Sequence, residues 1–190
     1  MKYDLAIIDY QMGNLFGLKC ALDHVKLKTL ITSDKKEIMN SKAIILPGVG
    51  SFGAAMKKIK EKKLDKIIKE YCDEKKFIIG ICLGMQLFFE KSSEIENNKG
   101  LALLKGSVVA FNNKKKYLNV GWATNRCKSN KSSLEKLINK KDAYFIHSYL
   151  VKPLDKNIVL SESSFENKVF CSSVKKDNIL GFQFHPEKSG

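Results

Sequence analysis

A cysteine held between two glycines constrains the structure of this chain most. In Gly80-Ile81-Cys82-Leu83-Gly84 it follows the apolar run 77–81, typical of a buried strand, and precedes residues 83–89, whose apolar pattern indicates a helix packed on that strand. Flanking glycines let a chain turn sharply from strand to helix and leave the side chain accessible at the top of a sheet. There the amides and the positive end of the helix favour a thiolate. The pattern predicts that Cys82 is a nucleophile.

A buried structural role is the alternative for any free cysteine, because cysteine commonly behaves as a small hydrophobe. We interpret the other four in that way: Cys20, Cys72, Cys127 and Cys171. Five cysteines without a Cys-x-x-Cys pair also argue against a disulfide scaffold and against a structural zinc site. We expect no metal and no cofactor.

Length and hydropathy point to one domain in a reducing compartment. A chain of 190 residues can bury a sizeable core, and no linker or repeat divides residues 1–190. The first apolar run, Leu5–Ile8, is too short for a signal peptide, and no stretch approaches the ~18 apolar residues of a membrane span. We therefore expect a soluble, cytoplasmic protein without a membrane partner.

The net charge of +14 raises the possibility of nucleic-acid binding, since phosphate contacts by basic side chains dominate such affinity. Of the 34 basic residues, however, only Arg126 is an arginine, the side chain best suited to bases and phosphates. The lysines are spread along the whole chain. We therefore prefer a solvated lysine-rich surface, which can still attract an acidic partner or a phosphorylated substrate.

Strand and helix signals alternate in the first half of the chain. Apolar runs predict strands at 5–8, 29–32, 43–46 and 77–81, an amphipathic helix begins at Leu15, and a long basic helix capped by Ser51 runs to Tyr71. From Val108 onward the segments are short and β-rich, at 108–111, 117–120, 143–146, 158–160, 169–174 and 179–184. The fold class predicted is α/β: an open, mostly parallel mixed sheet flanked by helices, with an antiparallel extension in the C-terminal half.

A cysteine nucleophile needs a base, which is usually histidine. His24 lies among polar residues near the end of the first helix, which indicates the surface. His147 follows an apolar strand and is either near a site or a hydrogen-bonded structural histidine. His185 ends the last strand, and on an extended segment Glu187 lies on the same side. Cys82, His185 and Glu187 therefore form the predicted triad, in which Glu187 orients the imidazole.

A thiolate that attacks a carbonyl carbon also needs backbone donors for the oxyanion. The Leu83 amide is one candidate, because it follows the nucleophile. The loop Pro47–Gly53 ends a parallel strand, where α/β sheets bind ligands, and its glycines allow a close backbone approach. A phosphate-binding loop is the alternative, but the P-loop lysine is absent. We prefer an oxyanion hole.

Three motifs together resemble the class I (triad) glutamine amidotransferases: Pro47–Phe52, Gly80–Gln86 and Gly181–Ser189. Within that class, three further segments are similar to the glutaminase subunit of imidazole glycerol phosphate synthase, a histidine-biosynthesis enzyme: Ile8-Asp9-Tyr10 with Gly13-Asn14, Gly121-Trp122, and Phe145–Tyr149. The resemblance implies a flavodoxin-like sheet and L-glutamine as the substrate.

The resemblance also implies a role for each motif residue. Cys82 attacks the side-chain carboxamide of glutamine, His185 protonates the departing ammonia, and Glu187 holds His185. The remaining residues would form the oxyanion hole or bind glutamine: Gly48, Val49, Gly50 and Leu83 for the former, and Gln86 for the latter.

A partner follows from the same resemblance. It is a synthase (cyclase) subunit of (β/α)8-barrel fold, which receives the ammonia in a heterodimer and makes imidazole glycerol phosphate and aminoimidazole carboxamide ribonucleotide (AICAR). Trp122 and Lys188 lie in segments that face the synthase in such enzymes. The family continues beyond the position of Gly190 into a terminal helix, so we expect a partner or further residues to cover exposed sheet there.

One departure from the family pattern favours an alternative function. The family has His-x-Gly-Trp-Asn where this chain has Asn119-Val120-Gly121-Trp122-Ala123. The change at a predicted interface would suit a paralogue that supplies ammonia to a sugar-modifying synthase of surface polysaccharides. A non-catalytic, basic nucleic-acid-binding module is the more distant alternative.

Overall fold

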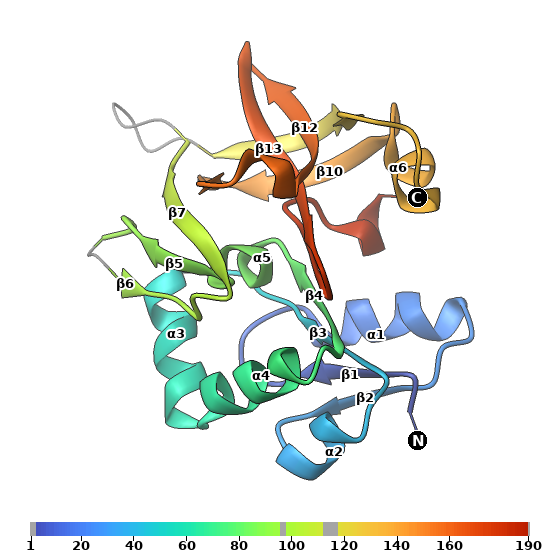
Figure 1. Cartoon of the computed structure of the whole chain (residues 1–190), viewed down its shortest axis with the longest axis vertical. Helices are drawn as coiled ribbons and strands as arrows, with labels where there is room; N and C mark the ends of the chain where they lie inside the picture. The colour runs from blue at the N-terminus through green and yellow to red at the C-terminus, as the bar shows by residue number, and fades with distance from the viewer. Residues whose placement is uncertain (1–2, 96–97, 112–117, 190) are drawn as a thin grey trace.

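The computed structural model describes residues 3–95, 98–111 and 118–189. Its main sheet has eight strands: β1 (Leu5–Ile8), β2 (Thr29–Thr32), β3 (Ala43–Leu46), β4 (Phe77–Ile81), β9 (Arg126–Cys127), β12 (Val159–Phe165), β13 (Lys168–Lys176) and β14 (Ile179–Phe182). They lie in the order β2-β1-β3-β4-β14-β13-β12-β9 (Figure 1). The first five pair in parallel and the last three are added antiparallel. The predicted fold class is confirmed.

Helices cover both faces of the parallel strands (Figure 1). One face carries α1 (Leu15–His24), and the other carries four helices: α2 (Lys35–Met39), α3 (Phe52–Glu61), α4 (Leu64–Asp73) and α5 (Leu83–Leu87). Successive side chains of a strand point to opposite faces, so Leu5 and Ile7 pack in the cluster of α1 while Ala6 and Ile8 pack in that of α3 and α4. All four are buried, which explains why this strand is apolar throughout.

The long basic helix predicted between Ser51 and Tyr71 is two helices, α3 and α4. Lys63, which precedes α4, has a left-handed backbone with φ 56° and ψ 21°. The burial pattern explains the break. The buried positions 52, 55, 56 and 59 of α3 recur about twelve residues later at 64, 67, 68 and 71, whereas one continuous helix would bring the exposed Lys63 to the core face.

Two smaller sheets lie in the second half of the chain. One pairs β8 (Asn119–Thr124) with β10 (Asp142–His147), and the other has four strands, in the order β11 (Tyr149–Pro153), β7 (Leu104–Ala110), β5 (Phe89–Ser92) and β6 (Asn98–Lys99). The antiparallel extension of the main sheet is present as predicted, but the strands predicted at 108–111, 117–120 and 143–146 correspond to β7, β8 and β10 of these smaller sheets. Tyr117, where one of those strands was predicted to begin, lies outside the described residues.

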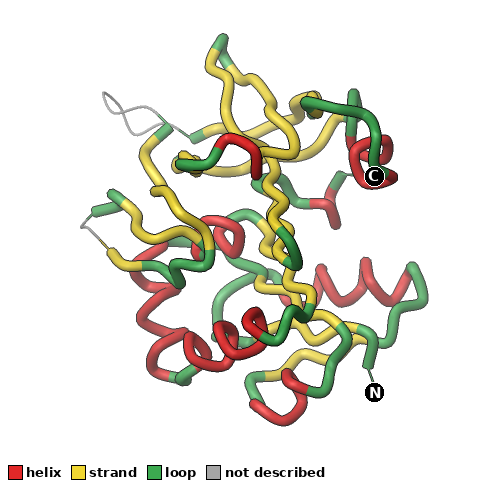
Figure 2. Tube along the Cα trace, in the orientation of Figure 1, coloured by secondary structure: helices red, strands yellow, loops and turns green. Residues whose placement is uncertain are grey.

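Helices gather around the parallel strands, whereas the second half is mostly strand and loop (Figure 2). It adds only α6 (Ser133–Ile138) and the 3-10 turns η1 (Lys156–Ile158) and η2 (Pro186–Lys188) within the described ranges. No described helix is long and apolar enough to cross a membrane. That residues 1–190 fold as one domain stays a prediction.

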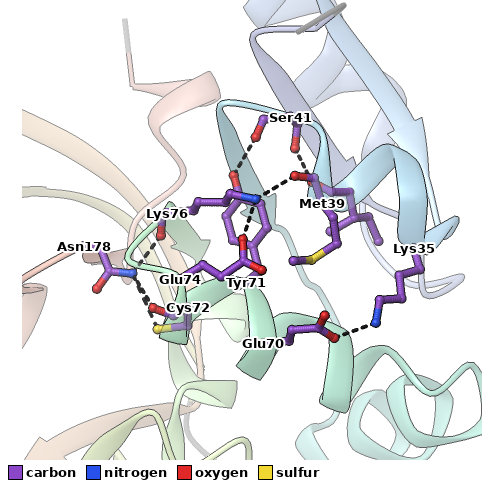
Figure 3. Close-up of polar contacts among 10 residues, drawn as sticks. Lys35, Met39, Ser41, Glu70, Tyr71, Cys72, Glu74, Lys76 and Asn178 are labelled. Atoms are coloured by element: carbon purple, nitrogen blue, oxygen red, sulfur yellow. Dashed lines mark hydrogen bonds and ion pairs between the residues drawn. The ribbon is translucent and has the colours of Figure 1, made fainter.

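Asn178 fixes the start of β14, the strand that leads to His185. Its Nδ2 donates to the backbone carbonyls of Cys72 at 3.0 Å and Lys76 at 2.7 Å (Figure 3). The hydroxyl of Tyr71 donates to the Ser41 carbonyl at 3.0 Å, so the end of α4 is also tied to the turn after α2. These contacts anchor β14 beside β4 at the edge of the sheet opposite to Cys82.

Asn178→Ala is expected to lower the free energy of unfolding by about 1–3 kcal/mol, because the carbonyls of Cys72 and Lys76 each lose a hydrogen bond. Urea unfolding followed by circular dichroism measures the effect. Asn130→Ala, at an exposed loop position, is the matched control and should change stability by less than about 0.5 kcal/mol. Equal stability of the two variants would contradict the anchoring role.

Candidate active site

Cys82 lies at the sharp junction of β4 and α5. Its backbone has φ 53° and ψ −111°, a conformation that strains a non-glycine residue by about 1–3 kcal/mol. Gly84 lets this turn approach β3, since a Cβ there would lie 1.8 Å from the Leu46 carbonyl oxygen. The Cys82 amide donates to the Phe182 carbonyl at 2.7 Å and so continues the β4–β14 ladder. This is the strand–turn–helix geometry of a nucleophile elbow.

Two groups make hydrogen bonds to the sulfur of Cys82, and the imidazole of His185 also interacts with it. Its thiol donates to the Ile146 carbonyl at 3.7 Å and accepts a hydrogen bond from Nε2 of Gln183 at 3.7 Å. The helix that follows is shorter than the sequence indicated, because α5 ends at Leu87 and β5 begins at Phe89. The Cys82 side chain makes no cap hydrogen bond to this short helix.

His185 and Glu187 form a nearly buried pair beside the end of β14. Nδ1 of His185 donates to Oε1 of Glu187 at 2.8 Å, and the two side chains are 5% and 7% exposed. The backbone of this segment is held to β10. The His185 amide donates to the Tyr144 carbonyl at 3.0 Å, and Oγ of Ser189 donates to the His185 carbonyl at 2.6 Å.

The environment of His185 favours the imidazolium. Burial favours the neutral ring, but interactions with the Cys82 sulfur and the Glu187 carboxylate outweigh burial and raise the pKa of His185 to about 9. Its Nε2 is buried and makes no hydrogen bond of ordinary geometry with any described residue. Because Nδ1 is bonded to Glu187, Nε2 is the ring nitrogen through which His185 can exchange a proton.

His147, the other histidine near Cys82, has the opposite character. Burial lowers the pKa of His147 to about 4, with a further contribution from the charge of His185. Nδ1 of His147 donates to the Tyr149 carbonyl at 2.9 Å, so Nε2 is the acceptor for Nδ2 of Asn119 at 3.0 Å. Both ring nitrogens are occupied, and the neutral ring is a structural element of the site.

A cavity of about 310 Å³ opens at Cys82. Besides Cys82, four of the predicted site residues line it: Val49, Gly50, Leu83 and Gln86. Gly48 does not line the cavity but packs on the elbow, because a Cβ there would lie 2.9 Å from Cβ of Leu83. The amide of Leu83, the first residue of α5, has no intrahelical acceptor. The loop and the elbow thus bring candidate oxyanion donors to one side of the sulfur.

Six other residues also line this cavity and were not predicted as site residues: Glu94, Leu118, Ile146, His147, Ser148 and Tyr149. Four of them belong to or adjoin the segment Phe145–Tyr149, which the family resemblance had singled out. Glu94 gave no signal, because an isolated glutamate in a polar loop follows no pattern. Its Oε2 accepts a hydrogen bond from the Phe52 amide at 2.6 Å, where Ser51 makes no side-chain cap.

Trp122 and Lys188, the predicted partner contacts, lie close together away from the sulfur. Trp122 on β8 is 57% exposed and packs edge-on against Tyr144 of β10, with ring centroids 5.9 Å apart. Nζ of the exposed Lys188 lies 5.7 Å from the centre of the same Tyr144 ring. The two residues thus share one surface, continuous with the segment that holds His185.

Comparison with known protein families bears on this geometry. The family described as "Glutamine amidotransferase class-I" matches residues 6–190. The chain belongs to the class I glutamine amidotransferase family. Class membership agrees with an elbow cysteine, a histidine–glutamate pair and a glycine loop gathered at the carboxyl ends of β3, β4 and β14.

Within this class, the chain is similar to proteins of one name. The chain is 41% identical to the imidazole glycerol phosphate synthase subunit HisH of Oceanobacillus iheyensis, over 98% of this chain and 92% of that one. It is 40% identical to the protein of the same name from Aquifex aeolicus, over 96% and 88%. A crystal structure of a glutamine amidotransferase superposes with a TM-score of 0.75 over 97% of this chain and 90% of that one; at 16% identity it supports the fold alone.

The two buried histidines should titrate far apart. In an NMR titration of the imidazole protons we expect a midpoint near pH 9 for His185 and near pH 4 for His147. Glu187→Gln should lower the His185 midpoint, because the carboxylate that stabilises the imidazolium is lost. A near-neutral midpoint for His147 would contradict its structural role.

The raised pKa of His185 also makes the free energy of unfolding depend on pH. The pKa of His185 rises on folding from 6.5 to about 9, so its contribution is complete below about pH 6.5 and is lost as the pH rises through 9. The stability difference between the wild type and Glu187→Gln should shrink over that window.

Proposed function

We propose that the chain is the glutaminase subunit of imidazole glycerol phosphate synthase and hydrolyses L-glutamine to glutamate and ammonia. The observation that carries the proposal is the arrangement of Cys82, His185 and Glu187: a cysteine on a strained elbow, 6% exposed but lining the cavity, beside a buried histidine whose Nε2 makes no hydrogen bond of ordinary geometry to the described residues. Family membership and about 40% identity to HisH proteins support it.

The geometry supports a two-step reaction. In the resting site the proton of Cys82 resides on Nε2 of His185, as a thiolate–imidazolium pair, and the thiolate attacks the carboxamide carbon of glutamine. Amides of Leu83 and of the Gly48–Gly50 loop stabilise the oxyanion. The imidazolium then protonates the departing ammonia, which leaves a γ-glutamyl thioester. His185, now neutral, removes a proton from a water molecule that attacks the thioester, and glutamate leaves as the thiol is restored.

The cavity supplies both polar and charged contacts for glutamine. The Glu94 carboxylate at its wall suits the α-ammonium group of the substrate, and the loop amides suit negatively charged oxygen. Gln86 lies beside Cys82 at the base of the same cavity, where the substrate side chain would enter. No step in this chemistry requires a metal or a cofactor.

An exposed apolar strip supports docking of a partner at the cavity mouth. Leu118, Val120 and Trp122 alternate along one side of β8 and its approach, and Ile146 pairs with Val120 across the sheet. Two of these residues, Leu118 and Ile146, also line the cavity. A (β/α)8-barrel synthase seated on this strip would receive ammonia where it is released, in a cytoplasmic heterodimer that makes imidazole glycerol phosphate and AICAR.

The changes at Asn119 and Ala123 do not favour the alternative function, in which the ammonia goes to a sugar-modifying synthase. Asn119 and Ala123 replace two polar family residues that we had assigned to the interface. In the structure Asn119 is 1% exposed and donates to His147, and Ala123 packs on the aromatic core cluster. The substitutions therefore lie on the inner side of β8, whereas Trp122 remains on its outer side.

Cys82→Ala is expected to lower glutamine-dependent synthesis by the reconstituted complex by at least ~10³-fold, because the nucleophile is lost. Synthesis from added ammonium chloride should stay within about twofold of the wild type, because the synthase uses ammonia directly. Cys20→Ala, which removes an exposed cysteine from α1, is the matched control and should leave both rates unchanged. Glutamine hydrolysis retained by Cys82→Ala would refute the nucleophile assignment.

Glutamine hydrolysis should also depend on the partner. We expect slow ammonia release from the isolated chain and a large increase when the synthase and its acceptor are bound, because the oxyanion donors become ordered in the complex. Trp122→Ala should reduce this stimulation at limiting synthase, whereas Leu154→Ala, which removes an even more exposed apolar side chain elsewhere, should not. Full activity of the isolated chain would rule out gating.

A further inference from the structure

Gln183 is a fully buried amide in contact with the sulfur of Cys82. It follows β14 directly and is 0% exposed. Phe182 and Phe184 on either side both join the aromatic core cluster, so alternation along an extended segment turns Gln183 toward α5. A buried amide is costly unless both of its ends are hydrogen-bonded. Both ends are bonded here, and one of the two partners is the proposed nucleophile.

A backbone carbonyl determines which end of Gln183 faces the sulfur. Nε2 of Gln86 lies 3.0 Å from the Tyr149 carbonyl oxygen, which can only accept, so the orientation of the Gln86 amide is fixed. The same Nε2 lies 3.1 Å from Gln183, and the atom it meets must therefore be the acceptor Oε1. Nε2 of Gln183 is then the atom directed at Sγ of Cys82, at 3.7 Å.

Besides His185, the sulfur thus has one acceptor and one donor as neighbours. The Ile146 carbonyl, also at 3.7 Å, can bind only the thiol, because its oxygen repels a sulfur anion. The Gln183 amide can donate to either form and binds the anion more strongly, since hydrogen bonds to charged groups are about twice as strong as neutral ones. When the proton passes from Sγ to Nε2 of His185, the electron pair stays on sulfur. The bond from Gln183 then gains strength together with the attraction of the imidazolium, whereas the bond to the Ile146 carbonyl is lost.

We infer that Gln183 donates the hydrogen bond that stabilises Cys82 as a thiolate, and that Gln86 is a positioning residue that orients Gln183. The inference rests on the proposed role of Cys82 as the nucleophile and adds a fourth residue to the proposed triad. It also revises the part expected of Gln86. Its Nε2 is committed to Tyr149 and Gln183, so only its Oε1 remains for the substrate.

Alkylation of Cys82 by iodoacetamide tests this without partner or glutamine. The rate is measured against pH by intact mass and peptide mapping, with Cys82→Ala identifying the signal. Gln183→Met keeps the bulk of the side chain and removes the donor. We expect the midpoint of its pH profile to rise by about one unit and its rate below that midpoint to fall about tenfold, with little change in the limiting rate at high pH.

Two further variants separate this effect from loss of packing. Phe182→Leu disturbs the neighbouring core residue but leaves the amide, so its pH midpoint should match the wild type even if its stability falls. Gln86→Met removes the group that orients Gln183 and should raise the midpoint by about half as much as Gln183→Met. Gln86→Met also carries the test alone if Gln183→Met does not fold.

The outcomes distinguish this inference from the proposed function. A wild-type midpoint in Gln183→Met, or in Gln86→Met when that variant is used alone, overturns the role of Gln183 while Cys82 remains the nucleophile. A midpoint raised equally in Phe182→Leu also overturns it, because general packing would then be the cause. If Cys82 in the wild type reacts no faster than the exposed Cys20, both the inference and the proposed triad fail.

Discussion

The parallel pairing of β4 with β14 is the contact on which the proposed site depends. These strands lie about a hundred residues apart in the sequence, and their register sets Gly80 opposite Gly181 and Ile81 opposite Phe182. The next residues along each strand are therefore Cys82 and Gln183. A shift by one residue would turn Gln183 into the aromatic core and Phe182 toward the sulfur. Correct register thus matters for the chemistry as much as for the packing.

Much of the fold follows from local pattern, and the exceptions have physical causes. Four parallel strands were predicted within one residue, because each is an apolar run bounded by polar residues. The division of α3 from α4 was missed, because no glycine or proline stands at or near Lys63. The only sign of it in the sequence is that the apolar positions of α4 do not continue the helical spacing of those in α3. The smaller sheets were missed as separate units, because short β segments carry no information about which strand they will pair with.

The site shows the same division between local and long-range information. Cys82, His185 and Glu187 were predictable because each stands in a motif with local mechanical reasons: flanking glycines, or two-residue spacing on an extended segment. Glu94 lines the cavity only because of the conformation of the loop between β5 and β6, which no local sequence pattern predicts. Gln183 lies within the motif Gly181–Ser189, but the sequence alone predicts no role for it. Its partners are the Cys82 sulfur and Gln86 of α5, and Gln86 is oriented by the Tyr149 carbonyl. Only the tertiary structure brings those groups together.

Two histidines within one site illustrate how position decides chemistry for identical side chains. Both are buried, which by itself would keep each ring neutral. His185 gains a carboxylate on Nδ1 and sulfur near Nε2, and these anionic or anion-forming neighbours reverse the effect of burial. His147 gains only a carbonyl and the Asn119 amide, and stays neutral. Asn119 cannot take up a proton, so Nε2 of His147 faces an uncharged partner. In the proposed mechanism the proton therefore moves between Cys82 and His185, while His147 stays neutral above about pH 4.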